Sequence, residues 1–313
     1  MYKSLDDIKT EYDRIRQTNE IKCSERKALI YKEHPKLKEY DGEIFSLFVK
    51  LVRSGQSNGA LNETESDIEK EIENVRNERN KYLKDNGIED NYREVQYTCN
   101  KCKDTGFVNG RKCSCFIEKE IELFDNISNF KKYIINDNFS KLDMSYYKQG
   151  DSYFKYMTTE IENIKKAIKE MDTKPFNILF IGPPGTGKTF LARSIGAEVI
   201  KLNKSVLYLN AMEYIDSLKP DYDGMPLKKY AVDADLFIID DLGTEYSSEF
   251  SKTEINYIID KRLNDQKSTI ITSNLIDVEL KARYLAPMCS RLDNLYHAIG
   301  LFGDDLRRLK KCQ

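Results

Sequence analysis

FIGPPGTGKT, residues 180–189, is the stretch that decides the fold of this chain. It holds the complete pattern G-x-x-x-x-G-K-[ST] from Gly182 to Thr189, follows an apolar run and leads into the helical sequence FLARSIGAEVI. This context is typical of a phosphate-binding loop, where backbone N–H groups at the start of a helix attract an anion. We expect ATP to be bound by the whole loop: Gly182, Pro183, Pro184, Gly185, Thr186, Gly187, Lys188, Thr189 and Phe190.

Two side chains of this loop are expected to carry chemistry. The Lys188 ammonium should reach the β- and γ-phosphates, and the Thr189 hydroxyl should lie on Mg²⁺. The backbone N–H groups of Gly185, Gly187 and Lys188 should hold the phosphates.

Two adjacent carboxylates follow at the end of the apolar run in LFIIDDLG, residues 236–243. Asp240 ends the run, which would place its carboxylate at the carboxyl edge of a sheet as a second magnesium ligand. Asp241 is then suitably placed to orient the attacking water. The alternative is an ordinary loop start. Asn274 ends the next apolar run, TIITSN, and can hold the same water or sense the γ-phosphate.

Two arginines near the C-terminal end of the sequence are spaced to suit the γ-phosphate. Arg291 lies in CSRL and Arg307 in FGDDLRRLKK. A permanent planar cation matches the charge that spreads over a transferring phosphoryl group. One of them would reach across a subunit boundary and the other would act within its own subunit. Surface salt bridges are the alternative for both.

The order of these elements resembles that of an AAA+ ATPase. Its Walker A lysine, Walker B pair, sensor 1, arginine finger and sensor 2 would be Lys188, Asp240 with Asp241, Asn274, Arg291 and Arg307, the catalytic residues that the resemblance implies. More narrowly, LFIIDDLG, IITSN and SRL…GDDLRR resemble the DnaC/DnaI-type bacterial helicase loaders and the related IstB-type transposition ATPases, over residues 139–313.

The resemblance also implies how hydrolysis is controlled. An arginine finger implies that hydrolysis depends on a neighbouring subunit, so self-association through the AAA+ domain is expected. Asp241 stands where most AAA+ proteins have Glu, so hydrolysis should be slow. Arg283 is the alternative finger, and Arg291 is preferred because it belongs to the SRL element.

Short apolar runs alternate with helical segments from Phe176 onward. Four strands are expected, at residues 177–182, 206–210, 236–241 and 269–274. Continuous apolar strands that alternate with helices favour a parallel sheet covered on both faces. We therefore predict the α/β class, an AAA+ P-loop NTPase domain with small helical lid elements over residues 137–313. An amphipathic helix should precede the first strand, with its apolar face on Met157, Ile161, Ile164 and Ile168.

A cysteine cluster lies in YTCNKCKDTGFVNGRKCSC, residues 97–115. Its spacing, C-x2-C-x10-C-x-C, lets four thiolates close a tetrahedral Zn²⁺ site. The ligands would be Cys99, Cys102, Cys113 and Cys115. An iron–sulfur cluster or a redox dithiol is the alternative. The other cysteines are interpreted as ordinary thiols: Cys23, Cys289 and Cys312.

The first 96 residues are polar, with apolar residues at helical spacing. They predict a helical adaptor region, a hairpin or small bundle, with a turn in SGQSNGALNETESD, residues 54–67. The alternative is a solvated helical region without a partner. Residues 97–136 would form the zinc knuckle and a linker helix, the latter at about 116–135.

The N-terminal half distinguishes the two related families. DnaI-type loaders carry an N-terminal zinc-binding helical domain that contacts the replicative helicase, whereas IstB-type proteins generally lack such a cluster. The resemblance thus implies an ATP-dependent loader that binds the hexameric DNA helicase and delivers it onto single-stranded DNA in replication initiation or restart. The alternative is an IstB-like ATPase that regulates DNA transposition.

Nucleic-acid contact would need a local patch, because 50 Lys and Arg nearly balance 52 Asp and Glu. The candidate segment is AMEYIDSLKPDYDGMPLKKY, residues 211–230. It offers cations and rings for single-stranded DNA: Tyr214, Lys219, Lys228, Lys229 and Tyr230. Acidic neighbours oppose this interpretation and leave a solvated helix and loop as the alternative: Asp216, Asp221 and Asp223.

The distribution of apolar residues also bears on location. The sequence has no apolar stretch of about 18 residues and no basic segment followed by an apolar run at its N-terminus. We therefore expect a cytoplasmic protein without a membrane partner.

Overall fold

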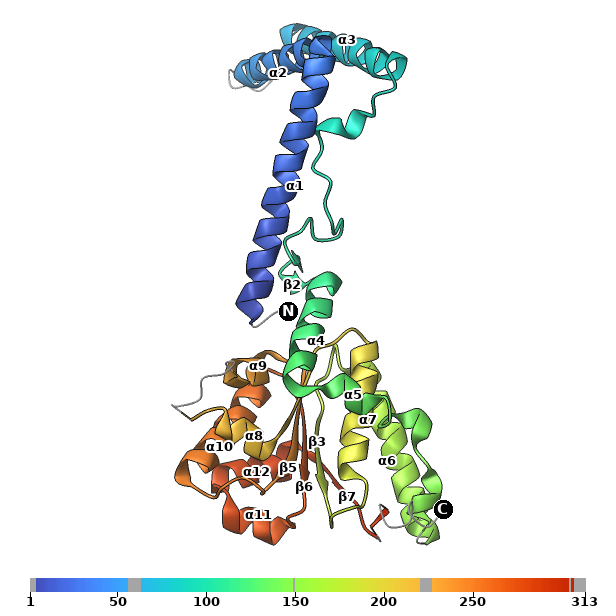
Figure 1. Ribbon diagram of the computed structural model, residues 1–313, viewed down its shortest axis with the longest axis vertical. Coiled ribbons are helices and arrows are strands. Elements are labelled where there is room, and N and C mark those ends of the chain that lie inside the picture. The colour runs from blue at the N-terminus through green and yellow to red at the C-terminus, as the bar shows by residue number, and fades with distance from the viewer. Residues whose placement is uncertain (1–3, 56–62, 149, 220–226, 304, 307–313) are drawn as a thin grey trace. The chain divides into compact units, whose positions relative to one another are not determined.

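The computed structural model describes residues 4–55, 63–148, 150–219, 227–303 and 305–306 (Figure 1). The chain divides into two units: one is Lys9–Arg111, and the other runs from Lys112 onward together with the beginning of the first helix, up to Ile8. The domain limits expected from the sequence, 1–96, 97–136 and 137–313, stay a prediction.

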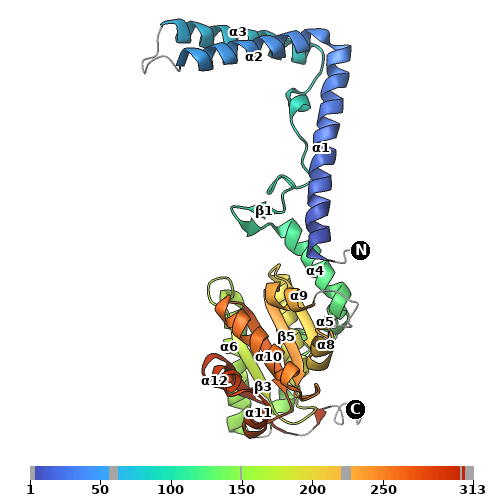
Figure 2. The ribbon, with the colours of Figure 1, turned by 90° about the vertical axis from the view of Figure 1, so that its left-hand side faces the viewer.

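The first unit is helical, as the sequence predicts. Its elements are α1 (Leu5–Glu33), α2 (Pro35–Gly55), α3 (Glu63–Asp85) and the 3₁₀-helix η1 (Asp90–Arg93). Proline opens α2 because the first helical position needs no backbone N–H donor. Figures 1 and 2 show α2 and α3 side by side as a hairpin. Part of the predicted turn, residues 56–62, lies outside the described residues.

A small apolar core holds this hairpin together. Leu47 of α2 packs with Ile72 and Val75 of α3, the apolar positions that the helical spacing indicates. Beside them, the Asp41 carboxylate accepts hydrogen bonds from the hydroxyls of Tyr31 (2.7 Å) and Tyr92 (2.6 Å). The same carboxylate forms ion pairs with Arg79 (2.9 Å) and Arg93 (2.6 Å). The Asp41 carboxylate is thereby paired with two hydroxyls and two guanidinium groups.

The second unit is built on a parallel sheet of five strands. In spatial order they are β4 (Val206–Asn210), β5 (Leu236–Leu242), β6 (Ser268–Ser273), β3 (Asn177–Ile181) and β7 (His297–Gly300). The four strands expected from the sequence are present. The sequence did not indicate β7, because this edge strand has four residues and its first two are exposed, so it lacks a continuous apolar run.

Helices cover both faces of this sheet (Figure 1). Phe180 of β3 faces α6 and α7, whereas its neighbour Leu179 faces Leu280 and Leu292 on the opposite side. The covering helices are α6 (Asp151–Glu170) and α7 (Lys188–Lys201) on one face, and α10 (Glu249–Asn264), α11 (Asp277–Arg283) and α12 (Ala286–Leu295) on the other. The predicted α/β class is confirmed, and the predicted apolar face of α6 is buried.

The expected linker helix is two helices. α4 (Ser114–Ser128) ends at Asn129, whose φ of 50° is left-handed, and α5 (Phe130–Ile134) begins directly after it. Asparagine tolerates this conformation better than most residues. The ring of Phe130 then packs so closely on α7 that a Cβ added at Gly196 would lie 2.6 Å from it. α5 is therefore held firmly on α7.

The remaining elements are short. They are the hairpin strands β1 (Phe107–Val108) and β2 (Arg111–Lys112), the 3₁₀-helices η2 (Phe139–Lys141) and η3 (Met144–Tyr147), and the helices α8 (Ala211–Asp216) and α9 (Leu227–Asp233). Among the helices that the structure describes, none has the length and apolar character needed to cross a membrane.

Candidate nucleotide and metal sites

The phosphate loop connects β3 to α7. Its glycines Gly182, Gly185 and Gly187 have φ of 148°, 81° and 98°, values that side chains with a Cβ rarely adopt. At Gly182 the limit is also steric, because a Cβ would lie 2.0 Å from the carbonyl oxygen of Leu301. Gly187 immediately precedes α7, so the first N–H groups of this 14-residue helix open toward the loop. This arrangement is suited to phosphate.

Lys188 is the first residue of α7 and is almost completely buried. Its Nζ donates hydrogen bonds to the carbonyl oxygens of Gly182 and Pro183, both at 2.7 Å. The ammonium group is therefore held within the loop, where phosphate oxygens are the competing acceptors. This placement supports the role expected for Lys188.

Thr189 and Asp240, the two expected magnesium ligands, lie side by side. The Thr189 hydroxyl donates to Asp240 Oδ1 at 3.0 Å, and the Thr272 hydroxyl of β6 donates to the same oxygen at 2.7 Å. Asp240 lies in β5, opposite Asn210 of β4, and is 3% exposed. A hydroxyl and a carboxylate are hard oxygen ligands of the kind that Mg²⁺ prefers, so the donor set fits this ion.

Asp241 leaves the regular strand. Its φ of 55° is left-handed, and the register between β5 and β6 shifts between Ile239 and Leu242. Its N–H donates to the Thr272 hydroxyl at 2.9 Å, and its carboxylate accepts from Asn274 Nδ2 at 3.3 Å. A left-handed aspartate is sparsely populated and is often found at functional sites. The left-handed backbone is combined with a contact between the Asp241 carboxylate and Asn274, which follows β6.

A cavity of about 390 Å³ is lined by most of these residues, although Asp240 is not among those that line it. Its wall includes Lys188, Thr189, Asp241 and Asn274, as the sequence suggests. Another part of the wall comes from a segment to which the sequence reasoning gave no role: Asp137, Lys141, Leu142, Asp143, Tyr146 and Tyr147. Rings and an aliphatic chain beside a phosphate loop are suited to a nucleotide base. The cluster of aromatic residues in NDNFSKLDMSYY was the available signal.

The arginines expected to act on the γ-phosphate do not line the cavity where they are described. Arg291 of α12 forms an ion pair with Asp260 of α10 at 2.5 Å and lies outside the cavity wall. Arg283 donates to the backbone and the buried carboxylate of Glu245. Arg307 lies outside the described residues, although the N–H of Leu306, directly before it, donates to the Gly185 carbonyl at 3.0 Å. Leu306 therefore lies beside the phosphate loop.

The segment proposed for DNA contact is mostly folded into the unit. The rings of Tyr214 and Tyr230 are fully buried, so they are not available for base stacking, and that part of the prediction is wrong. Lys228 pairs with Glu254 at 2.6 Å and Lys219 pairs with Asp216 at 2.6 Å. Lys229 pairs with Asp6 at 3.6 Å. Asp221 and Asp223 lie outside the described residues.

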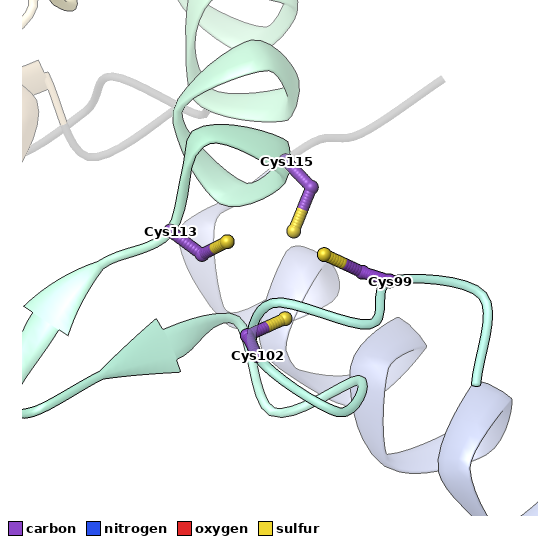
Figure 3. A group of neighbouring side chains, drawn as sticks. All are labelled: Cys99, Cys102, Cys113 and Cys115. Atoms are coloured by element: carbon purple, nitrogen blue, oxygen red, sulfur yellow. The ribbon is translucent and has the colours of Figure 1, made fainter.

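The four clustered cysteines converge as the spacing predicts. Their sulfur atoms all lie within 4.8 Å of one another, and Figure 3 shows them pointing toward a common centre. Four sulfurs around zinc at about 2.3 Å would be about 3.8 Å apart, so the donor set fits Zn²⁺. Asp104 shapes the first pair by accepting from the N–H groups of Thr98 (2.9 Å) and Cys99 (2.7 Å).

The cysteines outside the cluster behave as ordinary buried side chains where they are described. The Cys23 thiol donates to the Arg93 carbonyl at 3.3 Å. Cys289 is buried between α12 and α11, with its sulfur 3.7 Å from the Leu280 carbonyl oxygen. Cys312 lies outside the described residues.

The parallel sheet, phosphate loop and paired carboxylates define a P-loop ATP-binding domain of the AAA+ class. Residues 144–299 match the family model described as IstB-like ATP binding protein, so this part of the chain is similar to that family.

Curated relatives named "Replicative helicase loader DnaC" match part of the chain. The protein from Buchnera aphidicola subsp. Acyrthosiphon pisum is 32% identical over 117 residues, covering 36% of this chain and 48% of the relative. The Escherichia coli K12 protein is 27% identical over 119 residues, covering 36% and 49%. The resemblance to DnaC/DnaI-type and IstB-type ATPases is confirmed. The chain spans about half the length of these relatives.

Solved structures are similar at a lower level. The crystal structure of the DnaC helicase loader is 23% identical, with a TM-score of 0.45, and the match covers 55% of this chain and 99% of that one. The crystal structure of the DnaI is also 23% identical, with a TM-score of 0.45 and coverage of 56% and 92%. Both TM-scores lie below 0.5, so neither likeness carries an argument about function.

Proposed function

We propose that this protein is an ATP-dependent loader that binds the hexameric replicative helicase and delivers it onto single-stranded DNA in replication initiation or restart. The observation that carries the proposal is a nucleotide cavity in a chain that also has a helical hairpin and a four-cysteine cluster. An enzyme acting on a small molecule has no need of such an adaptor. The name shared by the curated relatives supports the same role.

Several residues at and beside the cavity have a role in the proposed hydrolysis of ATP. Lys188 and the first N–H groups of α7 bind the phosphates, and Thr189 with Asp240 would hold Mg²⁺, which neutralises charge on the β- and γ-phosphates. Asp241, steadied by Asn274, orients a water in line with the γ-phosphorus. The water oxygen bonds to phosphorus while its proton passes to Asp241, and the bond to the bridging oxygen breaks with its electron pair going to ADP, so the products are ADP and inorganic phosphate.

We also propose that ATP hydrolysis by this protein is slow and depends on a neighbouring subunit. Among the described residues that line the cavity, Arg193 is the one arginine, and it is already bonded to Asp137 and Tyr208. A further cation for the γ-phosphate then has to come from elsewhere. Arg291 is our candidate, supplied by the next subunit, because a single ion pair with Asp260 is its main restraint.

Mixing two inactive variants, Arg291→Ala and Asp241→Asn, tests whether the neighbouring subunit supplies Arg291. Arg291→Ala is expected to slow hydrolysis by about 10³-fold, the value of an arginine finger. A mixture with Asp241→Asn should regain activity, because the Asp241→Asn subunit offers its intact arginine to the intact site beside it. Steady-state phosphate release at a fixed total concentration measures this.

The comparison variant is Arg283→Ala, which removes the rival arginine. If the mixture is no more active than its components while Arg283→Ala is as slow as Arg291→Ala, Arg291 is not the finger. Binding of ATP by each variant, measured separately, ensures that only the catalytic step differs.

The helicase-binding surface that we propose lies on α2. Phe45 (70% exposed), Phe48 (40%) and Val52 (61%) follow the spacing i, i+3, i+7 and so share one side of the helix. Large apolar side chains grouped in this way mark a contact with another protein. An adaptor that binds a helicase needs an exposed apolar surface of this kind.

Phe45→Glu is therefore expected to weaken the complex with the helicase by about tenfold or more, because a buried aromatic anchor carries a large share of binding energy. Titration of fluorescently labelled protein with helicase, in the presence of ATP, measures the change. Ser46→Glu is the matched control, since it places the same charge on the next, exposed position of α2. Equal weakening by both variants would contradict the assignment of this face.

A second function remains open because the matching family model is IstB-like. An IstB-like ATPase that regulates DNA transposition would assemble on duplex DNA. Electron microscopy with ATP and duplex DNA distinguishes the two: filaments on duplex without a helicase complex favour the transposition role, and a stoichiometric helicase complex favours the loader.

A further inference from the structure

The buried carboxylate of Asp240 is held from two sides. Its Oδ1 accepts from Thr189 and Thr272, and its Oδ2 accepts from the hydroxyl of Tyr208. Tyr208 lies in β4, the edge strand beside β5, and the backbone register places it opposite Ile238. Its hydroxyl is thus the contact that fixes the second oxygen of the expected magnesium ligand.

The direction of this hydrogen bond is set by Arg193. Arg193 Nη2 donates to the Tyr208 oxygen at 2.5 Å. A guanidinium has only donors, so the tyrosine proton must point away from it and toward Asp240.

Arg193 is itself fixed. It lies in α7, one turn after Thr189, and its Nη1 donates to Asp137 Oδ2 at 3.0 Å. The guanidinium also lies over the rings of Tyr133 (3.9 Å to the centroid) and Tyr208 (4.8 Å). Burial lowers the pKa of Arg193, but the bonds to Tyr208 and Asp137 outweigh burial, and the pKa is raised. The cation is therefore permanent.

The ring of Tyr208 has little freedom to move. It stacks on Phe130 of α5 at 5.5 Å between centroids, with an interplanar angle of 25°. Because α5 packs tightly on α7 through Gly196, the ring is held between α5 and the sheet. Removing only the hydroxyl should leave this packing in place.

We infer that Asp137, Arg193 and Tyr208 form a positioning chain that orients the Asp240 carboxylate for Mg²⁺. None of the three would touch the metal; Arg193 orients Tyr208, and Tyr208 orients Asp240. The inference rests on the proposed ATP site and adds a dependence of magnesium affinity on residues outside the motifs. Hydrogen bonds to ligating groups fix their orientation, and losing one typically weakens metal binding about 10- to 100-fold.

Tyr208→Phe tests the inference. The concentration of Mg²⁺ that half-saturates hydrolysis should rise about tenfold, and direct Mn²⁺ binding, followed by electron paramagnetic resonance in the presence of ADP, should weaken by a similar factor. Nucleotide affinity without metal and the Tm should stay at their wild-type values. Arg193→Lys keeps the charge but cannot make both hydrogen bonds, so a smaller shift in the same direction is expected.

Tyr257→Phe, a change on an exposed ring of α10, is the control and should match wild type. Unchanged metal affinity in Tyr208→Phe would overturn the inference, as would a loss of metal-free nucleotide binding together with a fall in Tm, which indicates a packing role. Failure of the proposed ATP site looks different, because the wild-type protein itself would then bind no ATP, and failure of the loader role would leave these magnesium measurements unchanged.

Discussion

Replacing Asp241 by asparagine is expected to slow ATP hydrolysis by about 10²–10³-fold while ATP binding persists. The carboxylate lines the cavity, and its left-handed backbone aims it at the site that Asn274 shares. An amide of the same shape keeps the packing but cannot accept a proton from the water. Single-turnover hydrolysis and equilibrium binding of a fluorescent ATP analogue separate the two effects.

The control for Asp241→Asn is Asp277→Asn, the same change at the exposed start of α11. Glu245 is another carboxylate that follows β5. Its carboxylate accepts from Tyr284, Arg283 and the Gly243 N–H, and it does not line the cavity. Wild-type hydrolysis in Asp241→Asn would show that Asp241 is not the residue that activates the water.

The parts of the site that the sequence reveals are those that lie at the ends of strands. A phosphate loop, Asp240 and Asn274 each follow an apolar run, and parallel strands bring such ends to one edge of the sheet. Tyr208 and Arg193 could not be found in this way. Each sits within an element, and what gives it a role is a neighbour on a different element.

The burial of polar residues is the second feature that could not be predicted from the sequence. Arg262 in α10 would pass for a solvated cation, yet it is fully buried and donates to the carbonyl oxygens of Ala231, Ala234 and Ser268. Burial lowers the pKa of Arg262 to about 10. Tyr214 was misread for the same reason, because a tyrosine between charged residues looks exposed until its ring is found against Phe237.

Removing one ligand of the cysteine cluster is expected to have the second large effect. Cys102→Ser should reduce bound zinc from about one per chain to a small fraction, because a closed structural site needs all four ligands. Metal binding and local folding are coupled at about 10–16 kcal/mol in small zinc domains. The region around Thr98 and Cys99 should then lose its hydrogen bonds to Asp104 and exchange its amide protons faster.

Elemental analysis for zinc and iron, with hydrogen exchange over residues 97–115, measures these changes, and Cys23→Ser is the matched control because its hydroxyl can keep the bond to the Arg93 carbonyl. Iron in the wild-type protein would contradict the zinc assignment.

Cys102→Ser also separates the two roles that we propose for the chain, ATP binding and helicase binding. ATP binding should survive Cys102→Ser, since the cavity wall comes from Asp137 onward. Binding of the helicase should fall if the cluster supports the adaptor. Loss of helicase binding without loss of ATP binding would show that the two activities depend on different parts of the chain.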